Sequence, residues 1–365
     1  MTTSPTYANQ VPISDLPSHV GVGEEGSDAD PHARVLSLIN ASWTTQALGV
    51  ITALGVPDLL NDGPQSALDL AQAARCDASS LSRLLRALTS IDILRELDDG
   101  RFALTASGSL LRSDVVGSLA AWAAFSSTQS WSTWQQLEQS VRTGSSVRKQ
   151  ATGVDGFRHL DLDPVRAQLF NRAMVALTEP VADAFARRVE LKPGSVVVDV
   201  GGGYGQLIAR LLARQQTLRG VVFDLSHAIE VANETLESAG IADRCRLLAG
   251  DFFDRVPDNA DAYLLKSILH DWDDSAAAMI LRNCRRSMHQ DAVLFIIERI
   301  APEHHACESR DQDVARSDLN MLVATGGRER TAAQYHALLD AAGLQVKRSL
   351  PLYQSFGAIE AATKA

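Results

Sequence analysis

The sequence predicts an α/β protein whose second half forms a doubly wound, mostly parallel sheet. The first observation is residues 196–205, VVVDVGGGYG, where a buried strand leads into a glycine-rich turn. The second is the alternation of short apolar strands with helical segments from residue 196 to about residue 300. The third is that acids and other polar residues follow these strands, where a parallel sheet binds its ligands.

Composition and charge point to a small-molecule ligand. The 365 residues are 45% hydrophobic and 21% charged, which suits a globular protein of two domains. A net charge of −10 disfavours nucleic acid and anionic membranes as partners, because binding phosphates requires clustered Lys and Arg. The four cysteines are scattered without a CxxC pair, so a reducing cytoplasm is expected rather than a disulfide framework or a zinc site. No apolar run is long enough for a membrane span.

The chain begins with a predicted disordered tail over residues 1–32, which is rich in proline and acidic residues and has no signal-peptide pattern. Apolar residues at helical spacing follow from about residue 33 to residue 60. Two short helices, capped by Asp77 or Ser79 in the second case, then precede a strand pair around Asp99-Gly100. This helix, helix, hairpin order is typical of a winged helix, and the acidic chain favours a scaffold or dimerisation role over DNA binding.

Aromatic residues gather in the segment 118–143, which holds three of the five tryptophans within thirteen residues. A further predicted helix over 164–189 carries Phe170 and Met174. Aromatic residues at helical spacing are typical of a packed core, and they also suit the apolar wall of a pocket for an aromatic ligand. The sequence pattern leaves both interpretations open.

The strand ends of the second half predict a binding site for an adenosine-containing ligand. Asp224 lies 19 residues after Gly205, the spacing at which a carboxylate reaches ribose hydroxyls. A dinucleotide fingerprint requires glycine where this chain has Gln206, which favours a ligand without a pyrophosphate. Asp251 suits an adenine amino group and Phe252 suits its ring, but either residue could equally cap or pack. Single acids at strand ends are commonly helix caps, whereas polar residues after five successive strands favour a site.

The motifs DVGGGYG, VVFDL, GDFF, LLKSILHDWDD, IIERI and GGRERT together resemble the S-adenosylmethionine-dependent small-molecule O-methyltransferases of the caffeic acid and hydroxyindole type. That family includes bacterial members that tailor antibiotics. The resemblance implies a winged-helix dimerisation and substrate-lid domain over residues 33–185. It also implies a Rossmann-like methyltransferase domain over residues 186–365 with an antiparallel last strand, and a homodimer formed through the first domain.

The resemblance also assigns roles to residues of this chain. It implies that His270 is the general base for a hydroxyl of an aromatic secondary metabolite, expected to be phenolic, with Glu298 and Glu329 beside it. The implied residues for S-adenosylmethionine are Asp199, Gly201, Gly203, Asp224, Asp251, Phe252, Lys266 and Ser267. The implied acceptor-pocket residues are Trp131, Phe157, Phe170, Met174, Asp271, Asn320 and Met321. No metal is expected.

Two other functions remain open at this point. One is a relative with the methyltransferase fold that hydroxylates or decarboxylates a polyketide. The other is a winged-helix regulator whose second half senses a nucleotide. The presence of His270 with both glutamates favours methyl transfer over these alternatives.

Overall fold

The computed structural model describes residues 30–153 and 163–364 in two compact units, 1–43 and 44–365, each of which is considered by itself. In the first unit, α1 (Pro31–Asn40) starts after Asp30, whose side chain accepts from the His32 N–H. Pro31 suits the first helical position because its missing N–H would be unpaired there. Pro31 and His32, which fall within the predicted tail of residues 1–32, are thus part of this helix. The rest of that tail lies outside the described residues.

The predicted helix, helix, hairpin order is present in the second unit. α2 (Ser42–Ala53) begins two residues before this unit, and the unit contains the whole of α3 (Val56–Leu59), α4 (Ala67–Ala74) and α5 (Ala78–Thr89). Asp77 caps α5 by accepting from the Ser80 N–H at 2.7 Å, which decides between the two predicted caps. The strands β1 (Leu94–Glu96) and β2 (Phe102–Leu104) pair antiparallel. Apolar residues of these elements, among them Leu70, Leu85 and Phe102, form one buried cluster.

A run of helices connects this hairpin to the sheet. They are α6 (Ala106–Ser109), α7 (Ala120–Phe125), α8 (Trp131–Trp134), α9 (Leu137–Thr143), α10 (Val147–Thr152) and α11 (Pro164–Arg188). A π-helical turn, Ser126–Ser130, joins α7 to α8, and such turns are frequent at functional sites. The Phe125 ring stacks on Trp122 and meets Phe170 of α11 edge-on, both at centroid distances of 5.7 Å. Part of the predicted aromatic cluster is thus packed against itself.

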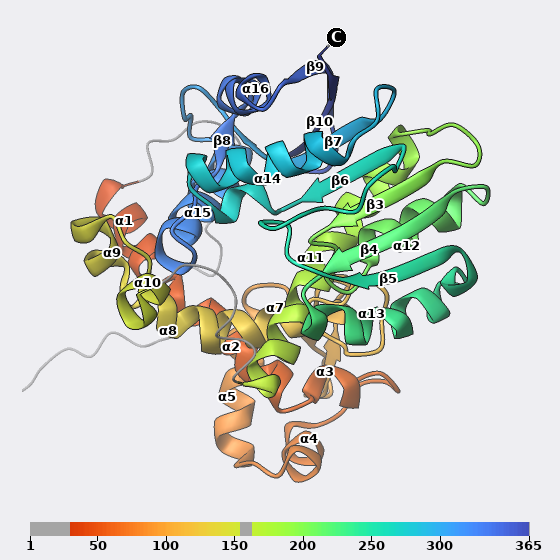
Figure 1. Ribbon diagram of the computed structural model, residues 1–365. Helices are drawn as coiled ribbons and strands as arrows, with labels where there is room; N and C mark the ends of the chain where they lie inside the picture. Colours follow the sequence, from red (N-terminus) through yellow and green to blue (C-terminus); the bar gives the residue numbers. More distant parts are fainter. Residues whose placement is uncertain (1–29, 154–162, 365) are drawn as a thin grey trace, which may run out of the picture. The chain divides into compact units, whose positions relative to one another are not determined.

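The eight-stranded sheet is mostly parallel, as predicted. Its path runs β5-β4-β3-β6-β7-β10-β9, and Figure 1 shows the strands in that order. The bounds are β3 (Val196–Val200), β4 (Arg219–Asp224), β5 (Cys245–Ala249), β6 (Ala262–Lys266), β7 (Val293–Ala301), β8 (Arg330–Thr331), β9 (Leu344–Pro351) and β10 (Phe356–Thr363). β10 runs antiparallel to β7 and β9, which confirms the antiparallel last strand. The short β8 pairs with the end of β7.

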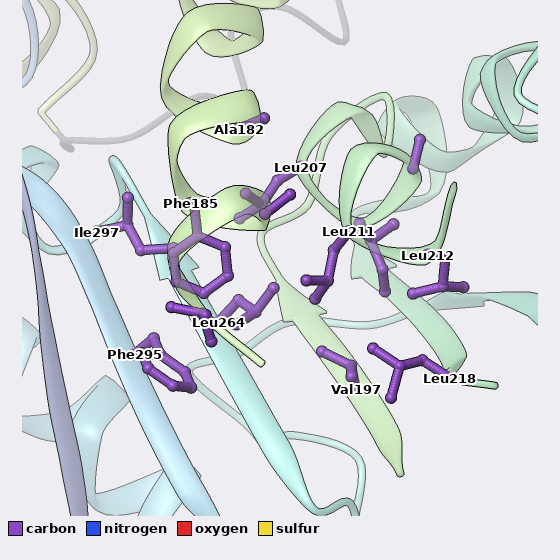
Figure 2. Close-up of a cluster of buried hydrophobic side chains, with 14 of the residues drawn as sticks. Ala182, Phe185, Val197, Leu207, Leu211, Leu212, Leu218, Leu264, Phe295 and Ile297 are labelled. Atoms are coloured by element: carbon purple, nitrogen blue, oxygen red, sulfur yellow. The ribbon is translucent and has the colours of Figure 1, made fainter. Parts of the chain in front are cut away.

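Alternate strand residues face two different helical layers. Val197, Leu264 and Phe295 share a cluster with α11, α12 (Gln206–Arg214) and α13 (Ser226–Ser238), and Figure 2 shows Phe185 of α11 lying over this face. Their neighbours Val198 and Leu265 pack with α14 (Asp274–Ser287) and α16 (Ala332–Ala341) instead. This period of two follows from the pleat. Burial on both faces explains why the central strands β3, β6 and β7 are mostly apolar.

The strand order reverses between β3 and β6, because the chain winds outward from β3 through β4 to β5 and then returns to β6. At such a point the loops after adjacent strands turn to opposite faces and leave a crevice at the carboxyl ends. The residues that follow β3, β4 and β6 therefore surround one place. α15 (Ser309–Ala324) packs beside β7 and adds a further wall.

Candidate active site

The turn after β3 exposes backbone at the strand ends because it is built from glycines in left-handed conformations. Gly201, Gly203 and Gly205 have φ values of +69°, +54° and +76°. A Cβ on Gly201 would collide with the Ile268 side chain, whereas the space around Gly203 is open for 4 Å. Gly205 is also the N-cap of α12, so the helix N-terminus points at the same place.

Asp224 lies against this glycine turn, as its spacing predicts. Its Oδ2 accepts from the Gly203 N–H at 2.7 Å, and its Oδ1 accepts from the Leu225 N–H at 2.6 Å. A carboxylate oxygen has two acceptor positions, so these bonds orient the group without saturating it.

Asp199 is buried beneath the turn with one oxygen that lacks a hydrogen-bond partner among the described residues. The residue is only 2% exposed, and the orphaned atom is Oδ2. Burial, reinforced by the nearby Asp224 charge, raises the pKa of Asp199 to about 7. An unpaired buried carboxylate is costly, which indicates a place for a hydrogen-bond donor or a cation.

The loop after β5 holds its two predicted residues in structural contacts. The Asp251 carboxylate accepts from the Phe253 N–H at 2.8 Å, a contact within a loop where no described helix begins. The Phe252 ring packs edge-on against Phe253 and Trp272, with centroids at 5.0 and 6.2 Å. Phe252 Cε1 also lies 3.6 Å from the position of a Cβ on Gly201, so one edge of its ring borders the turn.

Lys266 is the last residue of β6, and Ser267 follows it at the same edge of the sheet. The Lys266 ammonium donates to Thr178 of α11 at 2.9 Å, and its burial lowers its pKa to about 8. Ser267 has a φ of +53°, a left-handed conformation that is uncommon for a residue with a side chain. Such backbone strain is frequent at functional sites.

His270 lies in the turn after β6, where it meets both predicted glutamates. Its Nδ1 is 2.9 Å from Oε1 of Glu329 and 3.6 Å from Oε2 of Glu298. Glu329 Oε1 also accepts from the Ser317 hydroxyl at 2.7 Å. Glu298 Oε1 accepts from the backbone N–H groups of Ile268 and Leu269 at 3.0 and 2.9 Å. A carboxylate acceptor at Nδ1 favours the tautomer with its proton there, which leaves Nε2 as the proton-accepting nitrogen.

The carboxylates make His270 a strong base. Burial alone lowers the pKa of His270, but Glu298, Glu329 and Asp271 together raise it to about 10. Burial raises the pKa of Glu298 to about 7 against the opposing charge of His270. Burial also opposes ionisation of Glu329, but the charge and hydrogen bond of His270 hold its pKa below the usual range. The charges of both glutamates therefore stabilise the imidazolium, and Glu329 also accepts the hydrogen bond from its Nδ1.

The three residues could also hold a metal ion, because one ligand atom from each lies within 4.8 Å of the others. Oε2 of Glu298 and Oε2 of Glu329 are buried without a hydrogen-bond partner among the described residues. The other contacts of the cluster are those of a hydrogen-bonded histidine, since Nδ1 already faces Glu329 at hydrogen-bond distance. This arrangement suits a proton carrier.

The residues predicted for the acceptor pocket are only partly brought together. Asn320 of α15 accepts from the Trp134 indole N–H at 3.0 Å, a pairing across 186 residues that the sequence pattern did not predict. Asp271 Oδ2 is 3.9 Å from His270 Nε2, and burial raises the Asp271 pKa. Phe170 contacts Phe125, and Met321 is buried with its sulfur 3.7 Å from the Thr325 hydroxyl. Trp131 and Met174 are half-buried on α8 and α11, and Phe157 lies outside the described residues.

Two residues that the sequence analysis did not single out contact the backbone of the His270 turn. Arg330 is 1% exposed and donates to the carbonyls of Leu269 and Trp272, both at 2.7 Å. A Cβ on Gly327 would collide with the His270 carbonyl and lie 2.7 Å from the Trp272 N–H nitrogen. Both residues belong to the GGRERT motif, which was the available signal.

Two regions of the chain match known protein families. Residues 134–345 match the O-methyltransferase domain, and residues 36–114 match the O-methyltransferase dimerisation domain. The chain belongs to this O-methyltransferase family. It is an S-adenosylmethionine-dependent enzyme that methylates a hydroxyl group. The glycine turn and the orphaned Asp199 oxygen fit this cofactor, which needs close backbone approach and brings hydrogen-bond donors.

The methyltransferase is similar to enzymes of antibiotic biosynthesis along most of its length. It is 35% identical to the phenazine O-methyltransferase of Lysobacter antibioticus, over 90% of this chain and 95% of that protein. It is 37% identical to the mitomycin biosynthesis 6-O-methyltransferase of Streptomyces lavendulae, over 87% of this chain and 90% of that protein. A solved O-methyltransferase from neocarzinostatin biosynthesis, bound to S-adenosylmethionine and 2-hydroxy-5-methyl naphthoic acid, superimposes with a TM-score of 0.74 at 29% identity. That comparison covers 95% of this chain and all of that one.

Proposed function

We propose that the methyltransferase acts on a phenolic hydroxyl of an aromatic secondary metabolite and that His270 is the general base. The observation that carries this proposal is the buried hydrogen bond between His270 Nδ1 and Glu329 at the strand ends, beside the glycine turn. The relatives support the aromatic acceptor, since one is bound to a naphthoic acid and another is named a phenazine O-methyltransferase.

The base works through the proton at each ring nitrogen. Nε2 takes the proton of the acceptor hydroxyl while Nδ1–H stays bonded to Glu329, so the positive charge of the new imidazolium is balanced where it forms. A phenol has a pKa of about 10, and the carboxylates bring His270 to about the same value. Because the two pKa values are about equal, the proton transfer from the phenol to His270 has a free-energy change close to zero.

The cofactor residues hold the second reactant at the glycine turn. S-adenosylmethionine supplies an electrophilic methyl group on its sulfonium when bound. Gly201 and Gly203 admit it to the backbone, Asp224 would accept from ribose hydroxyls, and Asp199 Oδ2 would accept from a donor at the base of the site. Asp251, Phe252, Lys266 and Ser267 complete the rim of the crevice.

Asp224→Asn is expected to weaken binding of S-adenosylhomocysteine by ~10-fold or more, because hydrogen bonds to a charged acceptor are the stronger ones. Calorimetric titration measures the affinity directly. Asp243→Asn, an exposed acid in the turn before β5, is the control and should leave the affinity unchanged. Equal affinities for wild type and Asp224→Asn would remove Asp224 from the ribose site.

The acceptor pocket is proposed to lie on the Nε2 side of His270. Asp271 is on that side, and the Trp134–Asn320 bond ties α8 to α15, which carries Met321 and Ser317 as well. Phe170, Met174 and Trp131 are proposed as aromatic and apolar walls, together with Phe157. The assignment rests on the family resemblance for each of these side chains.

A homodimer is proposed through the first domain. Among the described residues, α1 buries none of its side chains and exposes Val35, Leu36, Leu38 and Ile39. Such an apolar helix is typical of an interaction surface, and the match to the dimerisation domain begins at residue 36.

The boundary between the two domains is proposed to lie between residues 185 and 186, near the end of α11. A cytoplasmic location is also part of the proposal. No described helix is both long and apolar enough to cross a membrane.

Glu329→Gln is expected to move the rising limb of kcat/KM to lower pH. The limb reports loss of a proton from His270, and wild-type carboxylates place it toward pH 10. Glutamine keeps a hydrogen-bond acceptor for Nδ1 but removes a negative charge, so the imidazolium loses stabilisation and the His270 pKa falls. The kcat/KM of wild type and of Glu329→Gln is measured with the same acceptor from about pH 6 to about pH 11. Ionisation of the acceptor then affects both profiles equally. An unshifted limb would show that Glu329 does not stabilise this charge.

A screen with isotope-labelled S-adenosylmethionine tests the proposed acceptor class. A panel of hydroxylated naphthoates, phenazines and quinones is incubated with the enzyme, beside the same compounds with the hydroxyl replaced by hydrogen. Label should move only to hydroxylated aromatic compounds. Transfer to aliphatic alcohols alone would contradict the phenolic acceptor, and release of a hydroxylated or decarboxylated product without label would favour the polyketide alternative.

A further inference from the structure

We infer that Arg330 is a positioning residue that holds the His270 turn in the geometry needed for base catalysis. The inference rests on the proposed role of His270. It comes from the way the backbone of residues 268–272 is bonded on both sides.

The carbonyl groups of the turn are held by the segment 328–330. Arg330 Nη1 donates to the Leu269 carbonyl and Nη2 donates to the Trp272 carbonyl, both at 2.7 Å. Of the two carbonyls between them, that of His270 accepts from the Arg328 backbone N–H at 2.8 Å. The planar guanidinium of Arg330 thus binds the Leu269 and Trp272 carbonyls, which lie on either side of His270 and Asp271 in the chain.

The N–H groups of the same turn are held by a different residue, Glu298. Glu298 Oε1 accepts from Ile268 and Leu269, so this carboxylate both orients the turn and faces His270 with its other oxygen. Its N–H groups bind Glu298 and its carbonyl groups bind Arg330, so the backbone of the turn is held in place. The His270 imidazole that it carries therefore has little freedom to move.

The same segment also delivers the carboxylate that pairs with His270. Glu329 precedes Arg330, and Arg330 pairs with Ile300 through β8 at the end of β7. The bonds from Arg330 to the turn therefore set the separation between Glu329 Oε1 and His270 Nδ1, which is 2.9 Å. A shift of about 1 Å at a reacting group can cost ~10²-fold in rate.

Only an arginine suits this position. The side chain is almost completely buried, and burying a cation is unfavourable unless its donors are bonded. Nε donates to Asp274 at 3.0 Å, so three nitrogens of one rigid fork meet three acceptors. A lysine ammonium is a single point and cannot span the Leu269 and Trp272 carbonyls in the same way.

Arg328 offers a matched control within the same motif. Its guanidinium donates to the other oxygen of Asp274 at 2.9 Å, and its side chain is 48% exposed. No described hydrogen bond joins its side chain to the turn, because only its backbone N–H reaches His270. Removing the Arg328 side chain tests the ion pair with Asp274 alone.

The test compares Arg330→Lys and Arg330→Met with Arg328→Met in the full-length enzyme. We expect both Arg330 variants to lower kcat, the Met variant by ~10²-fold, with a change below ~3-fold in the affinity for S-adenosylhomocysteine. Arg328→Met should stay within ~3-fold of wild type in both quantities. Circular dichroism and thermal unfolding identify the folded fraction, and the lysine variant keeps the comparison valid where the methionine variant is unstable.

A readout independent of turnover separates positioning from general stability. NMR titration of the His270 imidazole in Arg330→Lys should show a pKa below that of wild type, because the loosened turn moves His270 away from Glu329. Arg328→Met should titrate as wild type does. A folded Arg330→Lys with wild-type kcat and an unchanged His270 titration would overturn the inference. A fully active His270→Ala would instead refute the base role of His270. The NMR titration of His270 in Arg330→Lys would in that case still report whether Arg330 positions the ring.

Discussion

His270→Ala is expected to lower kcat by ~10²–10⁴-fold on a phenolic acceptor, the range that general-base catalysis contributes. The variant removes the ring whose Nε2 would take the hydroxyl proton and whose Nδ1 pairs with Glu329. S-adenosylhomocysteine should still bind, because the glycine turn and Asp224 make no described hydrogen bond with the histidine. Single-turnover rates measured at saturating acceptor give the effect on the chemical step.

His289→Ala is the control for this experiment. His289 is a histidine with a side chain 37% exposed, and it lies near Asp261 at the far end of the strands. Its removal should leave kcat unchanged. A His270→Ala enzyme with undiminished single-turnover rate would exclude histidine as the base and leave positioning of the two reactants as the source of the acceleration.

Gly327→Ala is expected to destabilise the enzyme by ~3 kcal/mol or more. The added Cβ would collide with backbone atoms of His270 and Asp271, which cannot rotate away as the end of a side chain can. The thermal midpoint should fall by roughly 6 °C or more on this cost. Folded variant protein should also have lower kcat, because the collision pushes the His270 turn.

Gly343→Ala separates this collision from the ordinary cost of replacing a glycine. Gly343 has a φ of +78° and open space for 4 Å around its Cβ position, so its substitution costs only backbone strain, about 1 kcal/mol. Gly327 has no such φ, and its cost is steric alone. Equal losses of stability in the two variants would contradict the close packing of the GGRERT segment on the His270 turn.

The local pattern of the chain was enough to predict the sheet and the cofactor edge. Strands buried on both faces read as apolar runs, and the residues that follow them share one edge by topology, so Asp224 could be placed beside the glycine turn from spacing alone. The hydrogen bond from Gly203 to Asp224 agrees with that placement. The same logic places His270, which follows β6, at this edge of the sheet.

The acceptor side depends on contacts between distant segments, and these have no local signature. The bond between Trp134 and Asn320 joins residues 186 positions apart, and no periodicity indicates it. No local pattern in the sequence indicates that Arg330 is buried, but tertiary packing leaves it only 1% exposed. The shift of His270 to a pKa of about 10 likewise follows from carboxylates contributed by β7 and by the segment before β8.

The atom that receives the methyl group tests the central claim most directly. An aromatic acceptor that carries both a hydroxyl and an amino group is incubated with S-adenosylmethionine labelled in the methyl carbon, and the product is assigned by NMR. The proposed function predicts label on oxygen alone, formed at a rate that rises with pH in the wild type and collapses in His270→Ala. Label on nitrogen, or on oxygen with the same pH profile in both enzymes, would contradict it.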